Sequence, residues 1–179
     1  MFKSKLLKLF TIFCFIILIN IMFSGCIDND DKNSGLSFNF ALLDGSDKNI
    51  NEYQGKIVLI DFFGVTCPPC QYQLAVLAQI YQDYKGTNLE IISIDVWTLP
   101  PRSETPEMIE ELIAQAREQD VFLDWTFGID DSKGTLFNKY IEGNGVPMLY
   151  LLDENGNVYY SKTGLTDYST LVNKIEELI

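Results

Sequence analysis

Histidine is absent from this 179-residue sequence, and basic residues are scarce, with 13 Lys and Arg against 25 Asp and Glu. Without an imidazole, the chain cannot form a Ser-His or Cys-His hydrolytic pair, or a His-ligated zinc or haem site. The formal net charge of -12 argues against nucleic-acid binding, because phosphate contacts need Lys and Arg. The 47% of hydrophobic residues is too high for a disordered acidic chain, so we expect one folded domain.

The N-terminus has the pattern of an export signal. Lysines at the start precede an apolar run from Leu9 to Phe23, which is followed by Ser24-Gly25-Cys26. A basic start, a short apolar stretch and small residues are typical of a secretory signal. An uncleaved membrane anchor is the alternative, because residues 6–23 are about as long as the shortest membrane-spanning helices. Either way, the remaining chain is expected outside the cytoplasm.

Residues 23–26 also resemble a lipobox, in which the Cys becomes the lipidated first residue of the mature protein. Cys26 is therefore the predicted lipidation site, and residues 1–26 are the predicted signal or anchor. Residues 27–35 are polar and are predicted to be a flexible tether to a domain at 36–179. Because this domain is acidic, we expect membrane attachment through the N-terminus only.

Strand and helix patterns alternate along the predicted domain. Residues 36–40 alternate in polarity before a turn at 44–46, which predicts an N-terminal hairpin. Residues 57–63 form a nearly unbroken apolar run, typical of a central strand that is buried on both faces. Further strands are expected at 89–96, 122–129, 148–152 and 158–161, and helices at 69–84, 106–119, 133–141 and after Asp167. This order predicts an α/β fold with a central mixed sheet and helices on both faces.

Only two cysteines, Cys67 and Cys70, lie in the predicted domain, where a strand turns into a helix. The positive end of the helix dipole stabilises a thiolate in the first turn, so Cys67 is the predicted nucleophile. Cys70 lies one turn further on the same face, where it can resolve a mixed disulfide on Cys67. Pro68 and Pro69 fix the backbone of this first turn and tune the potential of the pair.

Two other interpretations of the cysteine pair compete with redox chemistry. A structural disulfide is common in exported proteins, but this one would close a loop of two residues and add little stability. A zinc half-site would need two more soft ligands, and the domain has no His and no further Cys. No metal or other cofactor is expected.

Asp61 interrupts the apolar run at 57–63. A carboxyl is costly to bury without a partner, and such a break in a local pattern is expected at functional sites. A buried carboxyl with a raised pKa can take the proton from Cys70 as that thiol attacks. The alternative is an Asp that faces the edge of the sheet and binds the backbone or a lysine such as Lys56.

Val146-Pro147 precedes the strand predicted at 148–152. Proline is tolerated at the start of a strand, so this placement alone has a simple structural explanation. The functional interpretation is a cis Val146–Pro147 bond that exposes the Val146 backbone for pairing with a substrate strand beside Cys67.

These motifs together resemble the thioredoxin superfamily. The resemblance covers residues 36–179 and is carried by Asp61-Phe62-Phe63, Cys67-Pro68-Pro69-Cys70 and Gly145-Val146-Pro147. The export signal, the N-terminal hairpin and the insert at 98–119 are similar to the exported TlpA/ResA-like branch of redoxins. Thr66 stands where Trp is common in this family.

The resemblance implies a thioredoxin-like fold and a membrane-tethered enzyme that reduces protein disulfides. In that case Cys67 is the nucleophile, Cys70 the resolving thiol and Asp61 the proton acceptor. Client proteins with disulfides and a membrane thiol electron carrier are the implied partners, and cytochrome c maturation is one known role in this branch. Residues expected to contact the client are Pro147, Val146, Pro68, Pro69 and Thr66.

Three rival functions follow from the same sequence. A peroxiredoxin-like peroxidase shares the fold, but such enzymes have Thr or Ser three residues before the reactive Cys, where this chain has Gly64. A copper chaperone of the Sco type needs a Cys-x-x-x-Cys motif and a distant His, and this chain has neither. An exported binding lipoprotein with an inert structural disulfide is the non-enzymatic alternative.

Overall fold

The computed structural model describes residues 35–141, 143 and 145–179. The predicted signal or anchor, Cys26 and all but the last residue of the predicted tether lie outside these described residues. Within the described residues, no helix is both long enough and apolar enough to cross a membrane.

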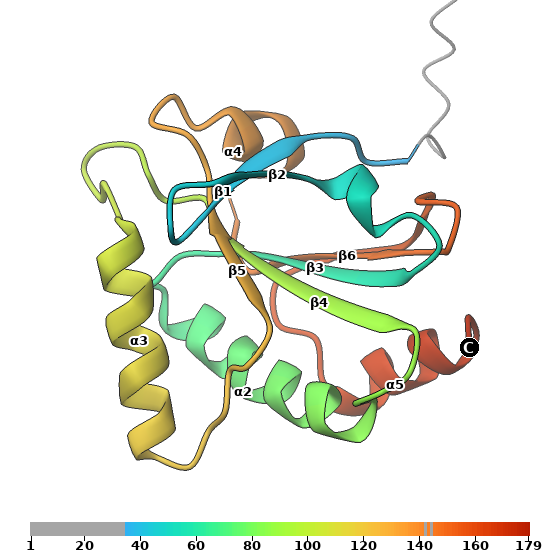
Figure 1. Ribbon diagram of the computed structural model, residues 1–179. Helices are drawn as coiled ribbons and strands as arrows, with labels where there is room; N and C mark the ends of the chain where they lie inside the picture. Colours follow the sequence, from blue (N-terminus) through green and yellow to red (C-terminus); the bar gives the residue numbers. More distant parts are fainter. Residues whose placement is uncertain (1–34, 142, 144) are drawn as a thin grey trace, which may run out of the picture. The chain divides into compact units, whose positions relative to one another are not determined.

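A seven-stranded sheet forms the centre of the described fold (Figure 1). Its strands, in spatial order, are β2 (Asp47–Asn49), β1 (Asn39–Leu42), β5 (Thr126–Ile129), β4 (Leu89–Asp95), β3 (Ile57–Phe63), β6 (Met148–Leu152) and β7 (Val158–Thr163). Strands β3, β4 and β5 run parallel, while β1, β2, β6 and β7 join by antiparallel pairing. The expectations of a mixed sheet and of an N-terminal hairpin are confirmed.

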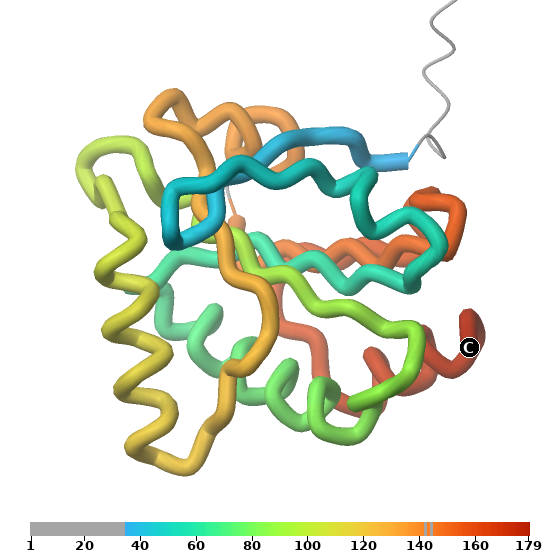
Figure 2. The backbone as a smooth tube through the Cα atoms, viewed as in Figure 1, coloured from blue at the N-terminus to red at the C-terminus, as the bar shows by residue number. Residues whose placement is uncertain are grey.

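Helices cover both faces of the sheet, as expected (Figure 1). Their bounds are α2 (Pro68–Asp83), α3 (Pro106–Glu118), α4 (Thr135–Tyr140) and α5 (Tyr168–Glu176), with a 3-10 turn, η1 (Ile50–Tyr53). Helices α2, α3 and α5 pack on one face, and α4 and η1 pack on the other. The path of the chain from β3 through α2 and back to β4 can be followed in Figure 2.

All seven residues of β3 are buried, which explains the continuous apolar run in its sequence. Side chains alternate along a strand, so Ile60 and Phe62 join the core under α4, while Leu59 and Phe63 pack beneath α2. Burial of one such side chain stabilises the fold by about 1.5–3 kcal/mol. Asp61 shares the face of Leu59 and Phe63, so its carboxyl lies on the side of the sheet that α2 covers.

The starts of two strands differ most from the expectations. The strand expected at 122–129 begins only at Thr126, because Phe122 is 43% exposed and Val121 donates its N–H to Ala116 at the end of α3. The first strand begins at Asn39 rather than at residue 36. Both differences arise because sheet pairing, rather than local polarity, decides where a strand begins.

The carboxyl ends of β3 and β4 meet at one edge of the sheet, where Phe63 lies opposite Asp95 in the parallel register. A four-residue connection then leads from β3 into α2. Gly64 begins this connection, and a side chain there would clash with the indole of Trp97. The close approach of Trp97 therefore requires glycine at this position.

Candidate active site

Cys67 and Cys70 form a disulfide at the N-terminus of α2, with their Cα atoms 5.2 Å apart. Cys67 is the N-cap residue, and its Sγ accepts a hydrogen bond from the N–H of Cys70 at 3.3 Å. Pro68 and Pro69 occupy the first helical positions, where no intrahelical donor is needed. Donors at a helix N-terminus favour a thiolate, so the geometry lowers the cost of forming one at Cys67.

The two cysteines are both buried but differ in their surroundings. Cys70 is fully buried, whereas Cys67 keeps 3% of its surface and is ringed by the exposed residues Thr66, Pro68 and Pro69. A disulfide partner that approaches from solvent therefore reaches Cys67 first. The arrangement is suited to exchange at Cys67 followed by attack from Cys70.

The loop before β6 lies against the cysteines. Its Val146–Pro147 bond is cis, as expected, and the carbonyl oxygen of Val146 lies 3.8 Å from the Sγ of Cys67. Val146 is half-buried and Pro147 is buried. The cysteine pair and the Val146–Pro147 segment, predicted from two separate parts of the sequence, thus meet at one place.

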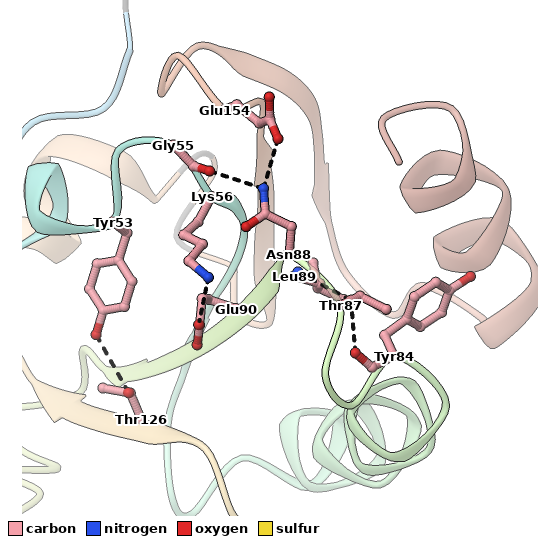
Figure 3. A network of polar contacts seen from close by, with 10 residues as sticks. All are labelled: Tyr53, Gly55, Lys56, Tyr84, Thr87, Asn88, Leu89, Glu90, Thr126 and Glu154. Atoms are coloured by element: carbon pink, nitrogen blue, oxygen red, sulfur yellow. Dashed lines mark hydrogen bonds and ion pairs between the residues drawn. The ribbon is translucent and has the colours of Figure 1, made fainter.

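Asp61 is fully buried in the centre of β3. Burial raises the pKa of its carboxyl to about 7, and a hydrogen bond from Ser93 opposes part of this rise. The alternative of an edge-facing Asp paired with Lys56 is wrong, because the Nζ of Lys56 lies 3.9 Å from Glu90 instead (Figure 3). A pKa near neutral is the property that a carboxyl needs to accept a proton at neutral pH.

A pair of buried acids, Asp95 and Glu104, holds the connection that carries Cys67. The Glu104 carboxylate accepts hydrogen bonds from the N–H groups of Val65 at 2.6 Å and Thr66 at 2.9 Å, and from the Thr66 hydroxyl at 2.5 Å. Asp95 also accepts from the Val65 N–H, at 3.1 Å. Burial, together with the adjacent Glu104, raises the pKa of Asp95 above its usual range.

Sequence reasoning missed Glu104, because it lies in the loop between β4 and α3, far along the chain from the residues it binds. Glu104 reaches the backbone next to Cys67 only because of the path that this loop takes. The only available signal was its position inside the insert at 98–119, ahead of the helix that begins at Pro106.

A groove of about 410 Å³ begins at Pro68 and runs between α2 and α3. Its lining consists of apolar and uncharged polar side chains, which include Tyr72, Leu112 and Val121. Tyr72 is 72% exposed at its rim. Because none of its lining residues is charged, the groove is suited to an apolar polypeptide segment.

Among the described residues, no group of three or more Cys, Asp or Glu residues has the arrangement of a metal site.

Comparison with known proteins places this site in a family. Residues 34–161 match the AhpC/TSA family. The chain belongs to that family. It is also similar to the thiol-disulfide oxidoreductase ResA of Geobacillus kaustophilus, with 27% identity over 142 residues that cover 78% of this chain and 74% of the relative.

Solved structures confirm the thioredoxin-like fold. A thiol:disulfide interchange protein of the thioredoxin family from Chlorobium tepidum superposes with a TM-score of 0.63 at 19% identity, over 83% of this chain and 98% of that one. StoA from Bacillus subtilis superposes with a TM-score of 0.61 at 22% identity, over 80% and 98%. The expected class of the enzyme, a protein-disulfide oxidoreductase, is confirmed by the family and by the similarity to ResA.

Proposed function

We propose that this protein reduces disulfide bonds of client proteins outside the cytoplasm, tethered to the membrane by its N-terminus. The observation that carries the proposal is the Cys67–Cys70 disulfide at the N-terminus of α2, on the same face of the sheet as the buried carboxyl of Asp61. The similarity to a thiol-disulfide oxidoreductase over most of the chain supports it.

The reaction begins from the reduced dithiol. The Cys67 thiolate attacks one sulfur of the client disulfide, and the client's other sulfur leaves as a thiolate, which takes a proton from water. Cys70 then loses its proton to Asp61, and its thiolate attacks Cys67. The bond between Cys67 and the client breaks, the client departs as a thiolate that is then protonated, and the Cys67–Cys70 disulfide forms.

Client binding is assigned to the surfaces around Cys67. Thr66, Pro68 and Pro69 are exposed beside the sulfur, and the backbone of Val146, ahead of Pro147, faces it. An extended client segment can pair with backbone groups at this position.

Regeneration of the dithiol requires two electrons. We assign them to a membrane thiol carrier, because glutathione and thioredoxin reduce disulfides in the cytoplasm and the proposed site lies outside it. Cys26 is the proposed attachment point, either as a lipidated residue or as the end of an uncleaved anchor.

Trapping of a mixed disulfide tests the catalytic roles. The full-length Cys70→Ser variant should accumulate disulfide-linked adducts with client proteins that disappear on reduction, because the resolving thiol is lost. The Cys67→Ser/Cys70→Ser double variant is the matched control, since any adduct through Cys14 or Cys26 persists in it. Equal adducts in both variants would contradict the assignment of Cys67 as the nucleophile.

The reduction potential of the Cys67–Cys70 couple tests the direction of the reaction. We expect a value near or below roughly -250 mV, on the thioredoxin side of the scale. A value near roughly -120 mV would instead indicate an enzyme that forms disulfides. Resistance to dithiothreitol would leave only a structural disulfide.

A further inference from the structure

Ser93 joins the carboxyl of Asp61 to the indole of Trp125. The Nε1–H of Trp125 donates to the Oγ of Ser93 at 3.0 Å, and the Ser93 hydroxyl lies 3.2 Å from Oδ2 of Asp61. A hydroxyl has a single proton to donate. Because its oxygen already accepts from the indole, the Ser93 proton is directed to Asp61.

We call this chain of hydrogen bonds, from Trp125 through Ser93 to Asp61, the relay. Packing fixes both of its ends. Ser93 lies opposite Asp61 in the parallel register of β3 and β4. The Trp125 ring lies between Tyr81 of α2 and Phe127 of β5, with centroid separations of 5.6 and 5.4 Å. Rotation of the indole would lose these contacts, so the N–H that sets the direction of the Ser93 hydroxyl is held in place.

The second oxygen of Asp61 has a different environment. Oδ1 is buried and has no hydrogen-bond partner among the described residues. An unpartnered buried carboxylate oxygen is costly, and this cost falls when the oxygen carries a proton. The two oxygens of the carboxyl therefore differ: Oδ2 accepts a hydrogen bond from Ser93, and Oδ1 has no hydrogen-bond partner among the described residues.

We propose that Ser93, held by Trp125, is a positioning residue that turns the Asp61 carboxyl so that Oδ1 is the atom that receives the proton of Cys70. This inference rests on the proposed function and adds to it the two residues that orient the proton acceptor. In the resolving step, the S–H bond of Cys70 breaks and its proton passes to Oδ1. The electron pair left on sulfur forms the bond to Cys67, and the client leaves as a thiolate.

Few titratable groups face Asp61 from the elements packed against it. Helix α2, which covers this face of the sheet, carries Cys70 and Tyr81, the latter against Trp125, and strand β4 carries Asp95 two residues beyond Ser93, beside Glu104 of the following loop. Strand β6 places Leu149 opposite Asp61, and α5 adds apolar residues. No basic side chain of the described residues forms an ion pair with Asp61.

Carbon-13 NMR of the aspartate carboxyl groups in the full-length oxidised protein tests the relay. The Asp61 resonance is assigned by its loss in Asp61→Asn. In Ser93→Ala the midpoint of its titration should rise by about one pH unit, because a hydrogen bond that favours the ionised form is lost. Ser93→Thr keeps the hydroxyl and should keep the midpoint, while Trp125→Phe should raise it by about half a unit.

The exposed Ser161 of β7 provides a matched control, and Ser161→Ala should leave the midpoint unchanged. An unchanged midpoint in Ser93→Ala would overturn the relay. An equal shift in Ser93→Thr would also overturn it, because the effect would then follow from packing rather than from the hydroxyl.

The lifetime of a mixed disulfide tests the catalytic consequence. Reduced protein is mixed with glutathione disulfide, quenched with acid, and the adduct on Cys67 is followed by mass spectrometry across pH. In Ser93→Ala the adduct should decay about fivefold more slowly at pH 7, since a smaller fraction of Asp61 is ionised. Its formation rate should stay unchanged, and Ser93→Thr should restore the decay.

The two proposals fail in different ways. If the wild-type protein forms no glutathione adduct that depends on Cys67, the proposed function fails, and the proton step fails with it. If the adduct forms and decays alike in wild type and Ser93→Ala at every pH, the proposed function stands and the role of Ser93 is overturned.

Discussion

The two ends of the β3–β4 pair are built from similar polar residues and behave differently. At the amino end, Lys56 and Glu90 form an ion pair whose side chains are each 44% exposed, and Asn88 donates to Gly55 and Glu154 (Figure 3). Beyond the carboxyl end, Asp95 and Glu104 are buried, and their hydrogen bonds go mainly to backbone N–H groups. One end is solvated, and the other holds acids away from water.

The difference shows what burial does to a polar group of the same chemistry. An exposed ion pair contributes about 0–1 kcal/mol, because water screens it. A buried carboxylate without a cation loses its hydration, so its proton affinity rises and its hydrogen bonds to the backbone become hard to replace. We therefore expect the free energy of unfolding to depend most strongly on pH and on substitutions at the end that carries the cysteines.

The largest expected effect concerns the free energy of unfolding, which should fall as the pH rises. Asp61→Asn should remove the part of this fall that is due to the Asp61 proton. The pKa of Asp61 is raised from 3.8 to about 7, so between these values the folded state keeps a proton that the unfolded state has lost. The stability that this proton provides is complete below about pH 4 and is lost as the pH rises to about 7. One proton corresponds to a slope of about 1.4 kcal/mol per pH unit.

Urea unfolding of the oxidised protein at several pH values between 4.5 and 7.5 measures this slope. In Asp61→Asn the free energy of unfolding should change with pH by about 1.4 kcal/mol per pH unit less than in wild type. In Glu90→Gln, at the solvated end, its change with pH should match wild type. Equal slopes in wild type and Asp61→Asn would show that the carboxyl titrates normally in the folded protein.

The next effect is the loss of the Glu104 carboxylate. Glu104→Ala removes the acceptor of the Thr66 N–H and leaves the Val65 N–H with Asp95 alone, and loss of such a partner costs about 1–3 kcal/mol. We expect a destabilisation of roughly 1–3 kcal/mol, measured by urea unfolding at pH 7, together with slower reduction of a disulfide substrate.

Glu104→Gln sharpens this test, because its amide keeps one acceptor oxygen and adds a donor that can face Asp95. It should lose less stability than Glu104→Ala. If Glu90→Ala at the other end proves as destabilising as Glu104→Ala, burial does not explain the contrast between the two ends.

The smallest effect is expected for the Lys56–Glu90 pair. A double-mutant cycle with Lys56→Ala and Glu90→Ala should give a coupling of about 0–1 kcal/mol at low salt, and the coupling should fall as salt is added. A coupling above about 2 kcal/mol that is insensitive to salt would mean that this pair is shielded from water.

The sequence was sufficient to predict the layers of the fold and most of the site. The apolar run at 57–63, the prolines after Cys67 and the cap at Asp167 are local signals, and each corresponds to an element in the structure. Asp61 could be predicted to be buried because an acid in such a run has little freedom to reach solvent.

The remaining parts of the site depend on contacts that no local signal encodes. Ser93 is the fifth residue of β4 and Asp61 the fifth of β3, so both interrupt their apolar runs at the same offset. That coincidence has meaning only once the register of the two strands is known. Trp125 and Glu104 depend further on the paths of two loops, which sequence periodicity does not determine.

Gln73 joins the helix that carries the cysteines to a residue close to the C-terminus, Thr166. Its buried amide donates to the carbonyl of Thr166 at 3.2 Å and accepts from the N–H of the same residue at 2.8 Å. A chain that emerges from its N-terminus has produced Cys67 and Cys70 about a hundred residues before this partner exists. The helix that carries both cysteines therefore gains this contact only after residue 166 has been made.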